Sequence, residues 1–504
     1  MITSADKDIA DYQAEVIRLR AQITYIEVQQ ELLEEHKMKL QSLLSPVRKI
    51  PNETLSRIFE YVCKENLFQD HPWPEDSDNK GKISPPTELS GPAITYLPTM
   101  AISSVCARWR ELALSLPSLW SQLKLEIFTA FQQEESPVSL IATLEIYLER
   151  SGDWPLAIAL NIRGDTTGDI PSALVHILPH THRWKRFKYS GEHTLTDFHI
   201  LSNFRFPLLS RLELEADSKG IPSRDLDRFE HAPKLRFLST DQWFPCKIPY
   251  DQLRLLSIGT HSRADMEQVL RSCPLLISLE LYSQSDLDFE TVTPAKAATS
   301  WRNITLLQFN MAHGKLYEMV FSSFNFPSLN HLRMKGKQDL FWPGRAIDSF
   351  ISRSSCRITI LTMDKVSVSD VELIAALRMM TYLEKLEVQD GIGESPITSH
   401  LISSLHAVGR NRSTGSIIYL VPKLQSLRLY FNGEALDDRA FARMIVSRWL
   451  PDPELASGIG VDCLRQVVLK CCKRNIDAET YKPLRDLDKM GLRVAIMGRD
   501  GVQV

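Results

Sequence analysis

Three histidines lie close together in the stretch HILPHTH, and histidines at this spacing can bind a transition metal. They are His176, His180 and His182. A zinc site needs its imidazole nitrogens to converge on one point. Pro179 would break the helix that could align the first two of these side chains. We therefore predict no metal at this stretch and no cofactor elsewhere in the chain.

Other sequence signals of catalysis are absent from the chain. It contains no GxxxxGK[ST], GxGxxG, GxSxG or HExxH string, so phosphate loops, nucleophile elbows and zincin helices have no local support. Among the eight cysteines only Cys471 and Cys472 lie close together, and no CxxC pair occurs. We predict that the chain is not an enzyme. A triad assembled from residues distant in the sequence is the alternative.

The composition limits the kinds of partner. The chain has 504 residues, 43% hydrophobic content and a formal net charge of -3, so it should form two or three domains without a global basic field. Direct binding of nucleic acid is therefore not expected. The chain shows no apolar run of spanning length and no secretory signal at its beginning, so we expect no membrane association and a cytoplasmic or nuclear location, or both.

The first 45 residues carry a heptad of apolar residues, which predicts a long coiled-coil helix. The first core position (a) holds Ile9, Val16 and Ile23, and the second (d) holds Tyr12, Leu19, Ile26, Leu33 and Leu40. Position a becomes polar at Gln30 and Lys37, and Pro46 stops the helix. The helix could pair with a second copy or with another protein. Alternatively, it could be a lone helix that folds back on the chain.

Residues 46–128 contain two helical patterns separated by an insert. In PNETLSRIFEYV the apolar residues recur at helical spacing after Asn52, which suits a helix cap. A second helix is expected in AISSVCARWRELALSL, where Val105, Trp109 and Leu112 would share a face. Between them, residues 69–98 are rich in proline and acidic residues, which predicts a flexible loop. Such short helices would be better buried against a partner.

These two stretches, in this order, resemble an F-box, the three-helix module that docks on the adaptor subunit of cullin-RING ubiquitin ligases. The Ile-Pro start, the Ile-Phe pair, the VCARWR core and the PSLW end carry the resemblance. With the preceding heptad helix, the chain resembles a group of F-box proteins expanded in fungi. The resemblance implies an adaptor-facing side with Pro51, Leu55, Ile58 and Phe59, closed by Val105, Trp109 and Trp120. Alternatively, these side chains only fill a core, and both roles can hold together.

From residue 137 to residue 504 the chain repeats the pattern L-x-x-L-x-L. The first apolar residue of each full string is Leu209, Leu253, Leu276, Ile304, Leu329, Ile358, Leu383, Leu424 or Leu464, with Leu235 in a partial string. The steps from Leu253 to Ile358 are 23, 28, 25 and 29 residues, within the range of leucine-rich repeats. We therefore predict an α/β fold: a long helix and a three-helix F-box module, then an irregular leucine-rich-repeat solenoid shaped like a horseshoe.

The strand period places particular side chains on the concave sheet of such a solenoid. Residues two and four places after the first leucine should face outward. This row includes Arg211, Glu213, Glu280, His331, Arg333, Lys385, Glu387 and Arg428. A concave sheet is the usual place for a protein ligand. The alternative is that these are ordinary solvated strand faces.

Two functions follow from this organisation. In the first, the chain is the substrate-recognition subunit of a cullin-RING (SCF-type) ubiquitin ligase, with adaptor and cullin bound through the F-box and a protein target on the solenoid. In the second, it is a ligase-independent scaffold that uses the coiled coil and the solenoid for protein interaction. A weaker third is a nuclear regulator that binds chromatin proteins. None of these names the target.

Overall fold

The chain forms two compact units, as the computed structural model shows. Unit 1 comprises Met1–Asn66 and Gly91–Gln122, and unit 2 comprises Leu67–Ser90 and Leu123–Val504. The predicted boundaries at 128 and 137 differ from this division, which places Leu67 and Leu123 in unit 2. The structure describes residues 2–43, 45–69, 85–129, 138–164, 171–191, 195, 204–216, 223–241, 243, 245–260, 262–282, 298–311, 314–336, 342–391, 395–407, 419–431, 436–499 and 501–502.

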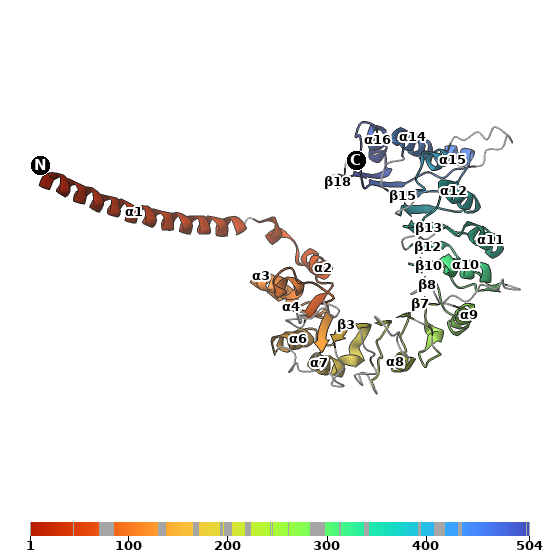
Figure 1. Ribbon diagram of the computed structural model, residues 1–504, viewed down its shortest axis with the longest axis horizontal. Helices are drawn as coiled ribbons and strands as arrows, with labels where there is room; N and C mark the ends of the chain where they lie inside the picture. Colours follow the sequence, from red (N-terminus) through yellow and green to blue (C-terminus); the bar gives the residue numbers. More distant parts are fainter. Residues whose placement is uncertain are drawn as a thin grey trace. The chain divides into compact units, whose positions relative to one another are not determined.

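Unit 1 begins with the predicted long helix, α1 (Ile2–Leu43), which is uninterrupted (Figure 1). All side chains described in it, from residue 5 to residue 41, are exposed. Short turns of 3-10 helix and four α-helices follow in this unit. They are η1 (Pro46–Lys49), α2 (Asn52–Val62), η2 (Ala93–Tyr96), α3 (Pro98–Val105), α4 (Ala107–Leu114) and α5 (Pro117–Trp120).

The core of unit 1 is small and mainly aromatic. Leu55 and Phe59 of α2 are buried, and the Phe59 ring meets the edge of Trp109 at 5.0 Å between centroids. Trp120 is fully buried, and its indole N–H donates to the Ala113 carbonyl at 2.8 Å. A buried Asn66 donates to the carbonyls of residues 119 and 122 at 3.1 Å each. These contacts join the helices of the unit to one another.

The second predicted helix is broken in two at Cys106, which corrects the expectation of one continuous helix. Cys106 has extended backbone angles (φ -160°, ψ 168°). Arg110 Nε donates to the Ser103 carbonyl at 3.1 Å, so the side chain takes an acceptor that a continuous helix would use for a backbone N–H. The Ser103 and Ser104 hydroxyls also donate to carbonyls three residues back. Such side-chain bonds compete with regular helix.

Asn52 was predicted to cap α2, but it does not. Pro51 occupies the cap position and makes no side-chain hydrogen bond there. The Asn52 carboxamide oxygen instead accepts from Arg108 Nε and Nη2, at 3.0 and 2.7 Å. Arg108 also donates to the carbonyls of Arg48 and Ile50, at 2.8 and 2.6 Å. This guanidinium therefore links α4 to the segment that leads into α2.

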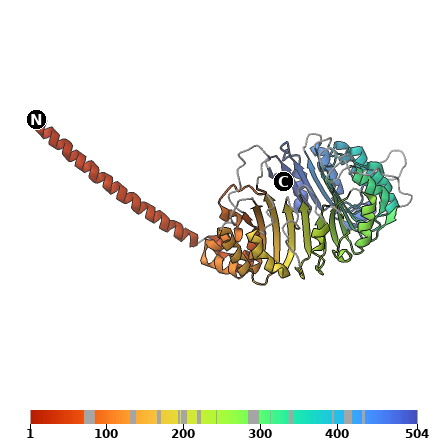
Figure 2. The same cartoon turned by 60° about the horizontal axis from the view of Figure 1, so that its bottom comes forward.

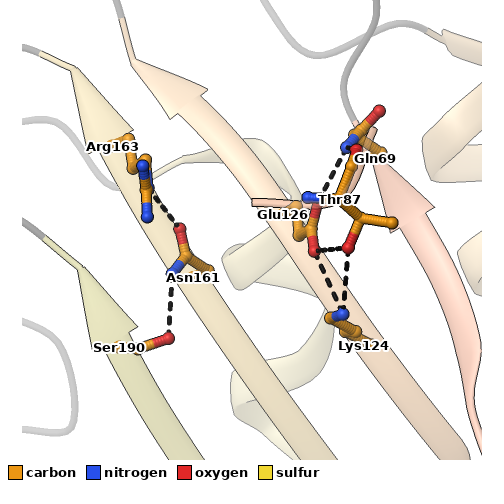
Figure 3. Close-up of polar contacts among 7 residues, drawn as sticks. All are labelled: Gln69, Thr87, Lys124, Glu126, Asn161, Arg163 and Ser190. Carbon is orange, nitrogen blue, oxygen red and sulfur yellow. Dashed lines mark hydrogen bonds and ion pairs between the residues drawn. The ribbon is translucent and has the colours of Figure 1, made fainter. Parts of the chain in front are cut away.

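The described parts of the predicted loop over 69–98 make specific hydrogen bonds to the sheet. Residues 70–84 lie outside the described residues. Gln69 ends strand β1 (Asn66–Gln69), and Thr87 hydrogen-bonds to the buried carboxylate of Glu126 at 2.6 Å (Figure 3). Gln69 Nε2 donates to the same carboxylate at 2.7 Å, and Lys124 Nζ lies 3.2 Å away. A buried carboxylate needs these partners, so it holds the ends of the insert in place.

Unit 2 is a repeat solenoid built on one continuous sheet. In the described part of the chain this sheet contains sixteen strands in the order of the sequence; the short strands β9 and β11 pair with each other outside it. The strands from β3 to β17 in this sheet are parallel to their neighbours. The strands follow an arc in this unit, with α9 to α12 along its outer side (Figures 1 and 2). The arrangement is that of a leucine-rich-repeat solenoid.

The strands are β1, β2 (Gln122–Thr129), β3 (Leu156–Gly164), β4 (Trp184–Gly191), β5 (Arg211–Ala216), β6 (Phe237–Thr240), β7 (Leu255–Gly259), β8 (Ser278–Tyr282), β9 (Thr299–Ser300), β10 (Leu306–Asn310), β11 (Phe324–Asn325), β12 (His331–Lys335), β13 (Ile360–Asp364), β14 (Lys385–Gln389), β15 (Ser426–Phe431), β16 (Gln466–Cys471), β17 (Arg493–Gly498) and β18 (Gly501–Val502). The helices are α6 (Val138–Arg150), α7 (Ser172–Ile177), η3 (Leu178–Arg183), α8 (Ser223–Asp227), η4 (Tyr250–Gln252), α9 (Arg263–Ser272), α10 (Gly314–Ser323), α11 (Gly344–Ser354), α12 (Asp370–Met379), α13 (Ser399–Ser404), α14 (Asp438–Arg448), α15 (Pro453–Ile459) and α16 (Lys482–Lys489).

The predicted repeat pattern is confirmed in every string. Each strand from β5 to β8, and each of β10 and β12 to β16, begins two residues after the predicted first apolar residue. Those apolar residues, from Leu209 to Leu464, are at most 2% exposed. The sheet begins earlier than predicted, with β1 and β2 before residue 137. The cause is that Leu123, Leu125 and Ile127 alternate like the later repeats and are buried.

A fully buried arginine hydrogen-bonds to backbone carbonyls in the core of the C-terminal repeats. Arg448, at the end of α14, donates to the carbonyls of Leu405, Leu420 and Val421. Burial lowers the pKa of Arg448 to about 10, so the guanidinium stays charged at neutral pH. Val421 has a positive φ of 42°, which is unusual for a β-branched residue. The guanidinium therefore holds a strained turn through its carbonyl oxygens.

Replacing Arg448 by Met should destabilise these repeats by about 3 kcal/mol or more, because three buried carbonyls each lose a charged donor and, among the described residues, only that of Val421 keeps another, the Leu424 N–H. The matched control is Arg443→Met, on the exposed side of the same helix, which should change stability by less than about 0.5 kcal/mol. Chemical unfolding of the full chain, followed by circular dichroism, measures both. Equal losses in the two variants would contradict this role.

Candidate protein-binding surfaces

The strands of unit 2 present two different faces. Along β5, Leu212 and Leu214 point into the core, whereas Arg211, Glu213 and Glu215 occupy the opposite face and are accessible. The in-register pairing repeats this alternation from strand to strand, so equivalent residues form rows across the sheet. This second face, which is not covered by the helices in Figure 1, is called the concave face below.

The structure places all eight predicted residues on the concave face, in three groups. Arg211, Glu213 and Glu280 lie around one hollow. His331, Arg333 and Lys385 lie on β12 and β14. Glu387 and Arg428 form an ion pair across β14 and β15, at 3.8 Å. Their positions are thus confirmed, and their role in binding a target stays a prediction.

The hollow on β5 to β10 has a volume of about 460 Å³. Its floor combines acidic, aromatic and small polar side chains. The lining residues are Arg211, Glu213, Glu215, Phe237, Ser239, Asp241, Ser257, Glu280, Tyr282, Asn310 and Met311. The lining has four carboxylates and one guanidinium. Lys188 on β4 also pairs with Glu215 at 3.0 Å and with Glu213 at 3.9 Å. The carboxylates still outnumber the cations, which favours a positively charged ligand group.

Hydrogen bonds fix several of these side chains. The Glu280 carboxylate accepts from Gln308 Nε2 at 2.9 Å and from Asn310 Nδ2 at 3.2 Å. The Tyr282 hydroxyl donates to the Thr240 carbonyl at 2.6 Å. Burial, and then the Asp241 carboxylate, raise the pKa of Tyr282, so this phenol remains a donor. The Arg211 guanidinium stacks on the Phe237 ring, 3.7 Å from its centroid.

The sequence prediction omitted eight of the eleven side chains that line the hollow, and five of these omissions have a simple cause. Phe237 and Ser239 follow the partial string at Leu235, which the prediction left without site residues. The prediction covered the positions two and four residues after the first leucine of each string. Six residues after it, one pleat further along the strands, lie Glu215, Tyr282 and Asn310. Extending the two-residue period by one step would have found these three.

The concave face changes sign along the sheet. From β12 to β15 it carries Arg333, Lys335, Lys385 and Arg428, with the acids Asp364 and Glu387. Burial, and then the charges of Arg333 and Lys385, lower the pKa of His331. His331 is therefore neutral in ordinary conditions, and the cationic character of this part comes from the arginines and lysines.

In unit 1 the predicted adaptor-facing residues divide into core and surface, and their role in docking stays a prediction. Leu55, Phe59 and Trp120 are at most 2% exposed and belong to the core. Pro51, Ile58 and Val105 are exposed, and Trp109 is half-buried. The helical period alone did not separate the two groups, because both faces of α2 carry apolar residues.

The exposed face of α2 is itself apolar. Ile58, Tyr61 and Val62 are 43%, 72% and 51% exposed, and residues three and four apart share one side of a helix. These three residues are called the α2 stripe below. Tyr61 and Val62 were not predicted as docking residues, although the spacing from Ile58 could have indicated them. An apolar stripe on a short helix is a typical protein-binding feature.

The three neighbouring histidines do not converge. The α-helix α7 ends at Ile177, and Pro179 lies in the first turn of η3 that follows it. His176 Nδ1 lies 3.2 Å from Glu145, while His182 Nδ1 faces the Pro179 carbonyl. Within the described ranges no group of three potential metal ligands is found. No described helix is both long and apolar enough to cross a membrane.

No family model matches the chain, and no curated protein matches it. Among solved structures, a leucine-rich-repeat protein of Leptospira interrogans is similar over 76% of this chain and 97% of that one. The two share 14% identity with a TM-score of 0.24, which carries no further argument. The repeat fold therefore rests on the leucine spacing and strand register described above, and the F-box resemblance stays a prediction.

Replacing Tyr282 by Phe should destabilise the repeat unit by about 1 kcal/mol, since the buried carbonyl of Thr240 loses its donor. Tyr430→Phe is the matched control, because Tyr430 occupies the same row on β15 and its hydroxyl makes no hydrogen bond among those found in the described residues. Thermal unfolding of both variants measures the difference. A loss in the control as large as in Tyr282→Phe would rule out this account.

Proposed function

We propose that the chain is the substrate-recognition subunit of a cullin-RING (SCF-type) ubiquitin ligase. The observation that supports the proposal best is the α2 stripe, which lies in the segment that resembles an F-box and is left outside the core of unit 1. An adaptor covering Ile58, Tyr61 and Val62 would remove this apolar surface from water. Exposed Val105 offers a further contact in the same unit.

The proposed role requires no chemistry from this chain. Unit 1 binds the adaptor and, through it, the cullin, and unit 2 binds a protein target. Ubiquitin is then transferred by an enzyme held elsewhere on the assembly. The chain contributes by raising the effective concentration of target lysines near that enzyme.

The hollow on β5 to β10 is the proposed target contact. Its excess of carboxylates suits an arginine or lysine side chain of the target, and the stacked Phe237 and Arg211 give it a flat wall. A cationic side chain entering there would share Glu213 with Arg211 and Glu215 with Lys188, and Glu280 and Asp241 line the same cavity. The proposal therefore favours a target segment that is basic at this point.

A ligase-independent scaffold is the second candidate. It is favoured by α1, whose apolar heptad residues are exposed and could join several chains without any adaptor. In that case the α2 stripe would bind another protein or pack against one. The two candidates differ in whether unit 1 captures the adaptor and the cullin.

The test is capture of purified adaptor and cullin by the full chain and by Ile58→Asp/Val62→Asp. We expect the wild-type chain to retain both proteins and the double variant to lose them, because two charges would be buried unpaired in the contact. Both substituted residues are exposed, so the variant should fold. A change at the buried Phe59 would instead disrupt the core of unit 1.

The matched control is Val371→Asp, an exposed valine on α12 of unit 2, which should not affect capture. Circular dichroism checks that all three proteins are folded. Capture by none of them would reject the ligase role and leave the scaffold function. Undiminished capture by the double variant would reject the α2 stripe as the docking surface.

A further inference from the structure

Helix α1 is an apolar surface without a described partner surface. Its eight apolar heptad residues are between 44% and 73% exposed. The helix is 42 residues long, and none of its described side chains is buried, so no tertiary packing stabilises it. Most helical stability in proteins comes from packing of an apolar face. A second helix along this seam would supply that packing.

We propose that α1 pairs with α1 of a second copy of the chain, and that the two helices run antiparallel. In antiparallel pairs an a residue packs against a d residue of the other helix. In one antiparallel register, every a residue of one helix lies against a d residue of the other. It places Ile9 against Leu40, Val16 against Leu33, Ile23 against Ile26, Gln30 against Leu19, and Lys37 against Tyr12.

The polar a residue Lys37 favours this direction over a parallel one. In a parallel dimer, Lys37 would face the Lys37 of the other copy within the seam, and two like charges in contact are unfavourable. In the antiparallel register each Lys37 lies against Tyr12, where its stem can pack on the ring and its charge can approach the ring face. Gln30 meets Leu19 in this register and does not favour it, since two Gln30 side chains facing each other could hydrogen-bond, so of the two polar a residues only Lys37 favours the antiparallel direction.

The charged residues that flank the seam also match in this register. The flanking pairs across the helices are Arg20 with Glu27, Glu15 with His36, Gln13 with Glu34 and Gln22 with Gln29, each occurring twice by symmetry. None brings two like charges together, and the Arg20–Glu27 pairs are attractive. Both members of this pair are exposed on α1 and accessible to a second helix.

This inference concerns α1 only and goes beyond the proposed ligase role. The chain could dimerise whether or not unit 1 binds an adaptor. The experiment below changes no residue of the α2 stripe, so its failure and the failure of the proposed function are distinguishable. A dimer would present two concave faces in one assembly, and two weak target contacts would then act together.

Charge exchange in the full chain tests both the dimer and its direction. Sedimentation equilibrium of the wild-type chain should show a dimer, and Arg20→Glu should raise its dissociation constant by about tenfold or more, because the introduced carboxylate would repel Glu27 twice. The double variant Arg20→Glu/Glu27→Arg should restore the wild-type value. In a parallel dimer Arg20 would instead face Glu15, so only Arg20→Glu/Glu15→Arg would restore it.

A second variant tests the seam itself. Ile23→Asp/Ile26→Asp places charges in its central layer and should give monomers. Thermal unfolding followed by circular dichroism shows whether units 1 and 2 are intact in this variant. A monomeric wild-type chain, a dimer that survives the aspartate variant, or restoration by Glu15→Arg would each overturn the antiparallel pair.

Discussion

No single repeat of this chain can bury its own leucines, and the rest of unit 2 depends on that constraint. A strand of five residues with a short helix has too little surface to enclose Leu329 or Leu424, yet both are fully buried. They are buried because each strand lies in register between two others, so that the leucines of neighbouring repeats stack. The same register aligns the outward residues and thereby produces the concave face.

At three boundaries between repeats, an arginine donates hydrogen bonds to the carbonyls at the end of the preceding helix. Arg183 donates to the carbonyls of residues 148 and 152 at the end of α6, and it is almost fully buried. Arg353 donates to the carbonyls of Phe321 and Phe324 at the end of α10. Arg448 does the same at the end of α13. Helix ends leave carbonyls without backbone donors, and a guanidinium from the next repeat supplies several at once.

The repeat strands were predictable from the sequence because their signal is local. An L-x-x-L-x-L string specifies its own strand and its own buried face, as the agreement at all ten strings shows. The same rule placed Glu213 and Arg333 correctly on the concave face. It stopped short of Tyr282 and Asn310 only because the period was not carried one pleat further.

The features that sequence reasoning missed depend on contacts between distant residues. The burial of Arg448 requires carbonyls 27 to 43 residues away, and nothing in its local sequence indicates them. Strand β1 and the ordered Thr87 depend on Glu126, whose burial is likewise a property of the assembled sheet. On α2 the period located the apolar residues but could not tell Phe59, which faces the core, from Ile58, which faces solvent.

The change of charge along the concave face restricts what can lie on it. A nucleic acid presents one sign of charge along its whole length, so the basic strands from β12 to β15 would attract it while the acidic hollow repelled it. A protein segment with its own mixed charges can match both parts, with basic residues over Glu213 and Glu280 and acidic residues over Arg333 and Lys385. If a segment binds there, the order of these charges would also set its direction, because reversing the segment would place like charges together.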